Sequence, residues 1–371
     1  MARRRYLAEQ VESDLARKMV LLAGPRQVGK TTLALGLTGA KRGYLNWDVA
    51  KDRDRILREE LPDSKLWVFD EIHKYRTWRN WLKGVWDGRP DGQRVLVTGS
   101  ARLDLYRRGG DSLQGRHHLL RLHPLSAAEL KLESPAQLTE LLNLGGFPEP
   151  YFGGSQREAR RWSREYRSLL VRDDVVSLER VQDLGNLERL TIRLPELVGS
   201  PLSVNGLRED LQVTHKTLTN WLLVLERLFA IFRVSPFGLR GTRVLRKAQK
   251  HYHLDWTLPP EPPQRFENLV AAHLLKWVHF QQDTEGRDVE LCYYRDLDGR
   301  EVDFVVREGK RALYLVECKW SDAEIDRGLR FLRAKHPEAA AWQIHAAGKK
   351  DYKSAEGIRV APAIQLLRTL V

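Results

Sequence analysis

A short glycine-rich segment has the residue types and spacing that bind a nucleotide phosphate. Residues 24–31 read GPRQVGKT, which follows the pattern G-x-x-x-x-G-K-[ST]. The glycines permit a tight turn whose backbone N–H groups face the phosphates, the lysine supplies positive charge to the β- and γ-phosphates, and the threonine hydroxyl binds Mg²⁺. The segment therefore predicts an ATP site made by Gly24, Pro25, Arg26, Gln27, Val28, Gly29, Lys30, Thr31 and Thr32.

Two adjacent carboxylates follow an apolar run further along the chain. The run KLWVFD ends at Asp70, and Glu71 comes next. With Thr31, Asp70 is a candidate for holding Mg²⁺, usually through water. Glu71 is a candidate for orienting and deprotonating the water that attacks the γ-phosphate. The alternative, a solvated acidic turn after a buried strand, is disfavoured by the glycine-rich loop upstream.

Other residues near this site are harder to assign. Ser100 ends the run RVLVTGS, and its hydroxyl is a candidate sensor of the γ-phosphate, although serine is also an ordinary turn residue. An arginine finger cannot be chosen from the residues alone, because each candidate is also explained as a surface charge. These candidates are Arg102, Arg107, Arg108 and Arg116.

A second group of charged residues lies near the C-terminus. Asp303 in GREVDFVV and Glu317 and Lys319 in LYLVECKW fall on two strand-like runs joined by a turn. Because side chains alternate along a strand, Glu317 and Lys319 share one face and Cys318 points away. Carboxylates bind Mg²⁺ or Mn²⁺, and a lysine can activate a water for phosphodiester attack. Glu267, on the preceding predicted helix, is a candidate for a further carboxylate.

The same group has two interpretations. It resembles the site of the restriction-endonuclease-like nucleases, which share a Glu helix, an Asp strand and an E-x-K strand. It is also explained as an inert, salt-bridged hairpin. In that case the positive charge of Lys319 offsets part of the electrostatic repulsion between the carboxylates of Asp303 and Glu317.

Residues 202–235 predict a helix-turn-helix followed by a basic hairpin. A short helix over about 204–211 and a turn at 212–214 precede a longer helix, whose apolar face is Leu218, Trp221, Leu222 and Leu225. Its opposite face carries the polar residues of a DNA-recognition helix: Lys216, Thr217, Thr219 and Asn220. The hairpin adds the basic residues of a wing: Arg240, Arg243, Arg246 and Lys247. A winged helix used only for packing or protein contacts remains the alternative.

The elements that position these residues predict an α/β fold. Short apolar runs alternate with helical patterns over the first 130 residues, which is typical of a parallel sheet. The expected strands are 19–24, 43–48, 65–70 and 94–100, and the expected helices are about 31–38, 50–60 and 78–87. The Gly- and Pro-rich residues 144–154 are expected to form a loop.

The rest of the chain predicts two further domains. Residues 157–230 have helical patterns and 232–253 a hairpin, and the proline-rich 258–263 is the best candidate linker. After it we expect helix 264–279, strands 289–295, 301–306 and 312–318, helix 322–335 and strand 340–345. The expected domains are a P-loop AAA+-like ATPase over 1–150, a helical and winged-helix domain over 151–258, and a restriction-endonuclease-like α/β domain over 259–371.

Composition limits the class of protein. In 371 residues, 42% are hydrophobic and 30% charged, which provides material for packed cores and excludes a wholly disordered chain. The net charge of +13 favours a polyanionic partner, nucleic acid before membrane headgroups, although charge also serves solubility. Two cysteines exclude a disulfide framework and a four-sulfur zinc site. Neither a signal peptide nor an apolar run of ~18 residues is present, so we expect a cytoplasmic protein without membrane partners.

The order of motifs along the chain resembles a widespread prokaryotic family of AAA-type ATPases with a C-terminal domain of unknown function. The motifs are GPRQVGKTT, VFDEIHK, VTGSARL, QGRH with LHPLSAAEL, GGFPEP, RDDVV, KHYHLD, FENLVAAHLLK, EVDFVV and LYLVECKW. The resemblance implies an AAA+-like core, a winged helix and an endonuclease-like domain. Lys30, Thr31, Asp70 and Glu71 match the family's ATP site. Arg116 matches its Gly-Arg motif, which favours Arg116 as the finger.

These observations predict a cytoplasmic, Mg²⁺-dependent ATPase that binds DNA, including branched or forked DNA, and uses hydrolysis to remodel it or move along it. ATP is expected at a subunit interface of a homo-oligomer, completed in trans by an arginine. One alternative is a switch ATPase that senses a partner protein or foreign DNA in defence or toxin–antitoxin biology, with a nuclease or docking domain at its C-terminus. Another is a metal-dependent nuclease, with a second Mg²⁺ or Mn²⁺, that the ATPase gates.

Overall fold

The chain divides into two compact units. The computed structural model describes residues 4–100, 103, 113–175, 183–238 and 249–371. One unit, the N-terminal unit, comprises Met1–His123 with Arg227–Phe229; the other, the C-terminal unit, comprises Pro124–Glu226 with Ala230–Val371. Each unit has its own sheet.

Five parallel strands form the sheet of the N-terminal unit, in the order β2-β3-β4-β1-β5. They are β1 (Met19–Ala23), β2 (Tyr44–Asn46), β3 (Leu66–Asp70), β4 (Arg94–Gly99) and β5 (His117–Arg121). Every residue of β1 and β3 is buried, as expected for strands covered on both faces. The four runs predicted as strands are confirmed as β1–β4, and the parallel α/β class is correct for this unit.

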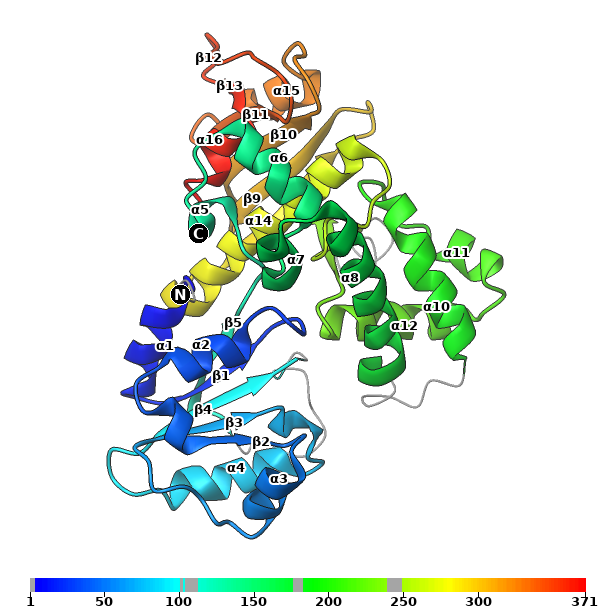
Figure 1. Ribbon diagram of the computed structural model, residues 1–371. Helices are drawn as coiled ribbons and strands as arrows, with labels where there is room; N and C mark the ends of the chain where they lie inside the picture. The colour runs from blue at the N-terminus through cyan, green and yellow to red at the C-terminus, as the bar shows by residue number, and fades with distance from the viewer. Residues whose placement is uncertain (1–3, 101–102, 104–112, 176–182, 239–248) are drawn as a thin grey trace. The chain divides into compact units, whose positions relative to one another are not determined.

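Helices cover both faces of this sheet. Figure 1 shows α1 and α2 on one face and α3 and α4 on the other. The helical elements are α1 (Ala8–Leu15), α2 (Lys30–Gly36), η1 (Ala40–Gly43), α3 (Ala50–Leu57), η2 (Ile72–Lys74) and α4 (Trp78–Asp87). Strands β1 and β4 are neighbours, and the chain runs from β1 to β2 on one side but from β4 to β5 on the other, so the connections of these two strands leave in opposite directions. Open parallel sheets bind ligands at the carboxyl ends of strands beside such a point, and the glycine-rich loop follows β1 there.

The C-terminal unit is built on an eight-stranded mixed sheet in the order β12-β13-β11-β10-β9-β8-β6-β7. The strands are β6 (Ile231–Pro236), β7 (Lys250–His253), β8 (Val289–Arg295), β9 (Glu301–Glu308), β10 (Arg311–Lys319), β11 (Ala340–His345), β12 (Tyr352–Lys353) and β13 (Arg359–Pro362). The predicted hairpin is confirmed, since β6 and β7 pair antiparallel.

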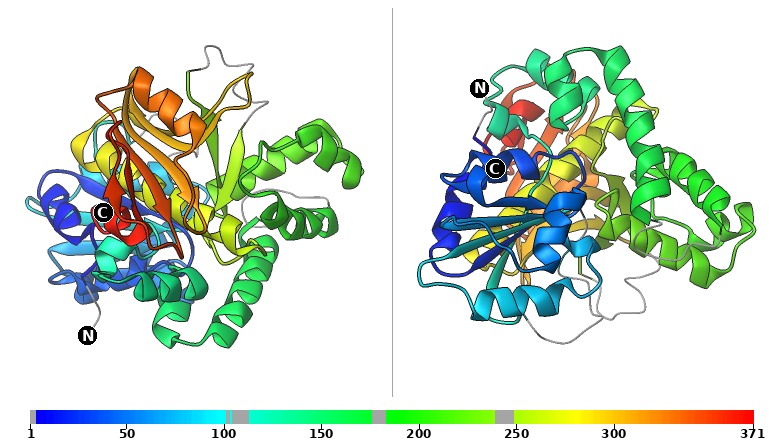
Figure 2. Two further views of the ribbon diagram at one scale, coloured as in Figure 1. Left: turned by 90° about the horizontal axis from the view of Figure 1, so that it is seen from above. Right: turned by 60° about the horizontal axis from the view of Figure 1, so that its bottom comes forward.

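Two helices cover opposite faces of this sheet, α14 (Pro262–Glu285) and α15 (Arg327–Lys335) (Figure 2). Side chains alternate between the two cores: Phe304 and Val306 pack with residues of α14, whereas Val305 packs with residues of α15. The remaining elements of the unit are α5 (Ala127–Leu130), α6 (Pro135–Leu144), α7 (Pro148–Gly153), α8 (Gln156–Leu169), η3 (Leu170–Val175), α10 (Leu184–Arg193), η4 (Leu194–Leu197), α11 (Val204–Asp210), α12 (His215–Arg227) and α16 (Ala363–Leu367).

The division into units differs from the expected boundaries after residues 150 and 258. Residues 124–150 belong to the C-terminal unit because Leu125, Leu138 and Leu141 join the core that surrounds α14. Residues 231–253 belong there because β6 pairs in parallel with β8. Backbone pairing and apolar packing thus join segments that the sequence places in three domains.

The loop expected at residues 144–154 is wrong at its centre, where α7 forms. Pro148 occupies the first turn of α7, where its missing N–H and fixed φ favour a helix start. A proline in the same role lies at the start of α14, within the segment expected to be a linker. Prolines here start helices as well as interrupt them.

No helix in the described part of the chain is long and apolar enough to cross a membrane.

Candidate functional site

The glycine-rich loop has backbone conformations that its sequence makes possible. Gly29, which precedes α2, has φ of 100°, in the left-handed region that glycine adopts readily. Gly24 lies close to Leu122, the residue that follows β5. A Cβ at Gly24 would lie 2.4 Å from the carbonyl oxygen of Leu122. A side chain at either position would therefore distort the loop.

Lys30 is directed into this loop rather than into solvent. Its side chain is buried, and its Nζ donates hydrogen bonds to the carbonyl oxygens of Gly24 at 2.9 Å and Pro25 at 2.7 Å. The ammonium group is thus held at the centre of the turn, where a phosphate group would meet it.

Asp70 lies beside the loop and accepts three hydrogen bonds from side chains. Its Oδ2 accepts from Thr31 Oγ1 at 2.7 Å and from the hydroxyl of Tyr44 at 2.6 Å, and its Oδ1 accepts from Thr98 Oγ1. The carboxylate is buried. Burial and the hydrogen bond to Asp70 raise the pKa of Tyr44, so its phenol remains a donor.

Sheet register explains why these residues meet. In the parallel pairs, Asn46 is opposite Asp70, and Asp70 is opposite Thr98. Strand β1, which leads into the loop, pairs with β4 so that Leu22 is opposite Thr98. The carboxyl ends of β1, β3 and β4 therefore bring the loop, the aspartate and the threonine to one edge of the sheet.

Glu71 follows Asp70 in a left-handed conformation, with φ of 56°. Its Oε2 accepts from Ser100 Oγ at 3.3 Å, and Lys74 Nζ lies 3.6 Å from the same oxygen. His73 Nε2 lies 3.7 Å away, and burial lowers the pKa of His73, which favours the neutral imidazole. The structure thus brings together Ser100 and Glu71, two of the residues predicted to act on the γ-phosphate.

Arg116 lies at the opposite end of the same sheet, where the strands begin. Its carbonyl oxygen accepts from the backbone N–H of Met19, the first residue of β1. Its guanidinium pairs with both carboxylate oxygens of Asp87, at 2.9 and 3.1 Å. The structure therefore does not bring Arg116 to the glycine-rich loop of its own chain. The alternative arginines Arg102, Arg107 and Arg108 lie outside the described residues.

The donor set at this site fits Mg²⁺ bound with a nucleotide. Thr31 and Asp70 offer hydroxyl and carboxylate oxygens, the hard ligands that Mg²⁺ uses, and the phosphates of a nucleotide complete such a shell. A set of three or more His, Cys, Asp or Glu side chains able to hold a metal is not found within the described ranges. A site completed by phosphates and water does not need one.

The two helices expected in the predicted helix-turn-helix segment are present as α11 and α12. The buried face of α12 includes the four apolar residues expected there, and Thr214 caps the helix by accepting from the backbone N–H of Thr217 at 3.1 Å. Lys216 and Asn220 are exposed, whereas Thr217 Oγ1 lies 2.9 Å from the hydroxyl of Thr214. Thr217 therefore contributes to the cap. The wing residues Arg240, Arg243, Arg246 and Lys247 lie outside the described residues.

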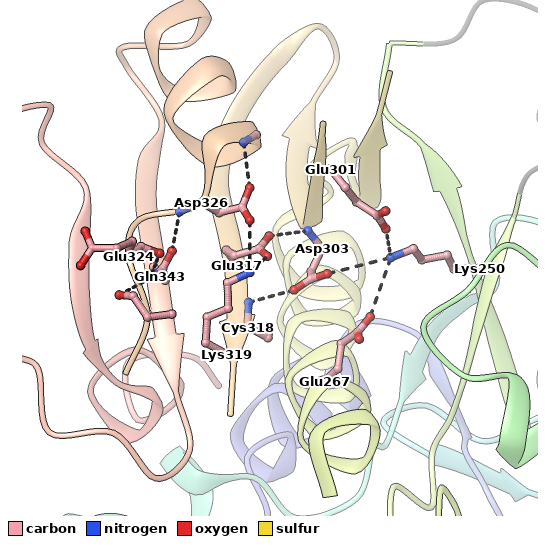
Figure 3. Close-up of polar contacts among 12 residues, drawn as sticks. Lys250, Glu267, Glu301, Asp303, Glu317, Cys318, Lys319, Glu324, Asp326 and Gln343 are labelled. Atoms are coloured by element: carbon pink, nitrogen blue, oxygen red, sulfur yellow. Dashed lines mark hydrogen bonds and ion pairs between the residues drawn. The ribbon is translucent and has the colours of Figure 1, made fainter. Parts of the chain in front are cut away.

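The second predicted site is also assembled, in the C-terminal unit (Figure 3). Asp303 Oδ2 accepts from the backbone N–H of Cys318 at 2.9 Å, and the N–H of Asp303 donates to Glu317 Oε2 at 3.2 Å. Lys319 Nζ lies 2.7 Å from Glu317 Oε1. Glu267, on α14, lies near the same residues, where Lys250 contacts it together with Glu301 and Asp303. We call this group the carboxylate cluster: Glu267, Glu301, Asp303 and Glu317 with Lys250 and Lys319.

Burial sets the protonation of this cluster. Burial, followed by the charge of Asp303, raises the pKa of Glu267 to about 7 and the pKa of Glu317 well above its ordinary value. Burial also raises the pKa of Asp303. On Lys319, burial lowers the pKa, but Glu317 outweighs it and raises the pKa overall. The raised pKa values of Glu267, Asp303 and Glu317 mean that these three carboxyl groups hold protons more tightly than exposed ones.

Sequence reasoning missed residues in both places. At the loop it missed Tyr44 and Thr98, which reach Asp70 from neighbouring strands. In the C-terminal unit it missed Lys250 and Glu301, although both lie within the motifs KHYHLD and GREVDFVV. The signal that could have found them is Lys250 itself, at the start of a strand whose residues are all buried. A lysine is almost never fully buried unless it is paired, so a carboxylate partner is expected beside it.

Comparisons with known protein families agree with the geometry of the loop. Residues 16–131 match the family described as "AAA domain". This match supports an AAA-type ATPase region at the N-terminus, a class of domain that binds ATP. Residues 135–258 and 264–366 match two further families, each described as a domain of unknown function, DUF8612 and DUF4143.

Similar proteins extend over most of the chain. An uncharacterized protein of Haemophilus influenzae is 22% identical over 355 residues, covering 85% of this chain and 86% of that protein. An uncharacterized protein of Mycobacterium tuberculosis is 24% identical over 391 residues, covering 99% of this chain and 85% of that protein. The similarity therefore includes both units rather than the ATPase region alone.

Proposed function

We propose that this protein is a Mg²⁺-dependent ATPase that binds DNA and uses ATP hydrolysis to remodel it or move along it. The observation that carries the ATPase part is the arrangement around Asp70, which accepts from Thr31 at 2.7 Å and precedes Glu71 in the chain. A loop that binds phosphates, a metal-binding pair and an adjacent carboxylate are the parts that phosphoryl transfer to water needs.

Each residue has a separate role in the proposed hydrolysis. Lys30 exchanges the carbonyl oxygens of the loop for the β- and γ-phosphates when a nucleotide enters. Thr31 and Asp70 would hold Mg²⁺, which would supply positive charge beside the phosphates. Glu71 leaves Ser100 to orient the attacking water and accept its proton, and the hydroxyl of Ser100 then faces the γ-phosphate.

The DNA part of the proposal rests on charge and on the exposed face of α12. Lys216 and Asn220 are four residues apart, so they lie on the same side of the helix, and both are exposed. Their position in the first turns of the second helix suits contact with a DNA groove. The net charge of +13 supplies long-range attraction to a polyanion.

The test measures DNA binding and ATP hydrolysis together. Binding of labelled single-stranded, duplex and forked DNA is followed by fluorescence anisotropy across a salt series, and phosphate release and DNA cleavage are measured in the same samples. We expect binding that weakens steeply with salt, since each neutralised phosphate contributes about −0.9 to the log–log slope. We also expect DNA to accelerate phosphate release.

Two charge-reversal variants separate the α12 face from general electrostatics. Lys216→Glu should weaken binding to every DNA sequence and reduce the magnitude of the salt slope by about 1. Lys353→Glu, which changes an exposed lysine on β12 in the same unit, should leave the slope nearly unchanged. Absence of DNA binding at low salt would contradict the DNA part of the proposal and leave the ATPase part standing.

A further inference from the structure

The carboxylate cluster contains a lysine from an unexpected strand. Lys250, on β7, is only 1% exposed, and its Nζ lies 2.5 Å from Glu301 Oε1, 3.9 Å from Glu267 Oε1 and 4.0 Å from Asp303 Oδ1. Figure 3 shows Lys250 reaching the carboxylates from one side and Lys319 from the other. The ammonium group lies where these three carboxylates converge.

Three carboxylates of the cluster each have an oxygen that already accepts a hydrogen bond. Glu267 Oε1 accepts from the hydroxyl of Tyr252 at 2.7 Å, besides facing Lys250. Asp303 Oδ2 accepts from the backbone N–H of Cys318 at 2.9 Å, and Glu317 Oε1 accepts from Lys319 at 2.7 Å. Ligands of Mg²⁺ lie at about 2.0–2.1 Å from the ion. A cation at the same point would therefore have to displace the ammonium group.

Charge balance explains why the ammonium stays in place. Burial acts to lower the pKa of Lys250, but the charges of Glu267, Asp303 and Glu301 outweigh burial and raise it. Lys250 is therefore positively charged at neutral pH. Two lysines face the four carboxyl groups of the cluster, and Lys319 also contacts Asp326 at 3.2 Å. Burial and the charge of Asp303 raise the pKa of Glu267, so a proton on Glu267 offsets part of the excess negative charge.

We infer that Lys250 is a permanent counter-ion that occupies the position of a divalent cation in the carboxylate cluster. The resemblance to restriction-endonuclease-like nucleases implies a metal at these residues, and the residues present do not fit one. The cluster instead fastens β7 to α14 and β9, through Glu267 on the helix and Glu301 and Asp303 on the strand. This inference does not depend on the proposed DNA-binding function.

The test compares stability and Mn²⁺ binding in the full-length protein without nucleotide at pH about 8. Lys250→Met removes the charge while keeping an unbranched side chain. Removing one partner from a buried group of charges leaves the others uncompensated, so we expect the melting temperature to fall by about 10 °C. Mn²⁺ should bind the vacated carboxylates and restore part of this loss.

A matched control is available in the same unit. Lys276 is equally buried, and its Nζ lies 2.8 Å from Glu129 Oε2. Lys276→Met should also lower the melting temperature, but Mn²⁺ should not restore it, because Lys276 Nζ contacts neutral oxygens of Ser126 and Pro124 beside the carboxylate of Glu129 and not a convergence of several carboxylates. The contrast separates a vacated cation position from a general loss of stability.

The wild-type protein gives a second, independent readout. Mn²⁺ binding, followed by electron paramagnetic resonance, should be the same in wild type and in Asp303→Asn, since any bound Mn²⁺ then belongs to another site. Mn²⁺ binding that Asp303→Asn abolishes would overturn the inference, as would an unchanged melting temperature in Lys250→Met. The wild-type comparison decides the matter even if Lys250→Met does not fold.

Discussion

The hydroxyl of Tyr44 donates a 2.6 Å hydrogen bond to the carboxylate of Asp70. The accepting oxygen, Oδ2, also accepts from Thr31. Asn46 donates in turn to the Tyr44 hydroxyl at 3.2 Å, so the tyrosine is held by the strand that carries it. Thr31 and Asp70, the pair proposed to bind Mg²⁺, are therefore positioned in part by a residue of the edge strand β2.

Tyr44→Phe should weaken the response of the ATPase to Mg²⁺. Loss of the phenol leaves Asp70 with fewer restraints, and changes to residues that orient a metal ligand typically cost about 10–100-fold in metal affinity or activity. We expect the Mg²⁺ concentration for half-maximal hydrolysis to rise about tenfold at saturating ATP. Tyr75→Phe, which alters a tyrosine stacked on Trp47, is the control. An unchanged Mg²⁺ dependence in Tyr44→Phe would show that Thr31 and Thr98 hold Asp70 without it.

Lys30→Ala and Glu71→Gln should fail at different steps. Lys30→Ala removes the charge that meets the phosphates, so we expect binding of a fluorescent ATP analogue to be lost. Glu71→Gln keeps the site but removes the base, so we expect binding to remain while phosphate release falls by about 10²–10⁴-fold. Lys41→Ala, at an exposed lysine of the same unit, should change neither. Wild-type turnover in Glu71→Gln would exclude Glu71 as the base.

The N-terminal sheet was predictable because its signals are local. A parallel strand covered on both faces must be apolar along its whole length, and the runs that end at Ala23 and Asp70 have this property. The candidate residues Thr31, Asp70 and Glu71 lie next to the ends of these strands, so a correct strand assignment places them together. The apolar pattern that predicts the strands therefore also predicts which residues of the candidate site lie together.

The parts that sequence reasoning missed depend on pairing between distant segments. Tyr44 reaches Asp70 because β2 pairs with β3, and Lys250 reaches Glu301 because β7 pairs with β6 and β6 with β8. Neither register follows from apolar periodicity, which is the same for several pairings. The buried ion pair between Lys276 and Glu129 joins residues 124–150 to α14. It likewise cannot be predicted from the residues near either member in the sequence.

The stability of the C-terminal unit should depend on pH through Glu267. Burial, followed by the charge of Asp303, raises its pKa from 4.5 to about 7. A carboxyl group with a raised pKa binds its proton more tightly in the folded state, so protonation stabilises that state. This contribution is fully present below about pH 4.5 and is lost as the pH rises through about 7. We expect Glu267→Gln, which is neutral at every pH, to flatten the dependence across this window.

The control for this prediction is a glutamate with the opposite shift. The hydrogen bond that Glu308 accepts from Arg287 lowers the pKa of Glu308 from its ordinary value of 4.5. Glu308 therefore loses its stabilising charge only below about pH 4.5. Thermal melts of Glu308→Gln should therefore keep the wild-type slope between pH about 4.5 and about 7. Equal slopes in wild type and Glu267→Gln would assign the pH dependence to other groups.

Arg116 lies too far from the glycine-rich loop to act at the ATP site of its own chain, but its position allows a role at the site of a neighbouring copy. It lies at the edge of the sheet where β1 begins, whereas the glycine-rich loop follows the end of β1. An arginine that completes the site of another subunit contributes about 10³–10⁵-fold to turnover. We expect Arg116→Ala to bind ATP normally and to lose phosphate release on this scale. Mixing Arg116→Ala with Lys30→Ala should then restore activity, since an intact loop from one copy meets an intact arginine from the other. Mixing Lys30→Ala with Glu71→Gln should restore none, because both changes impair the same side of the interface. Wild-type turnover in Arg116→Ala would show that Arg116 serves only its ion pair with Asp87.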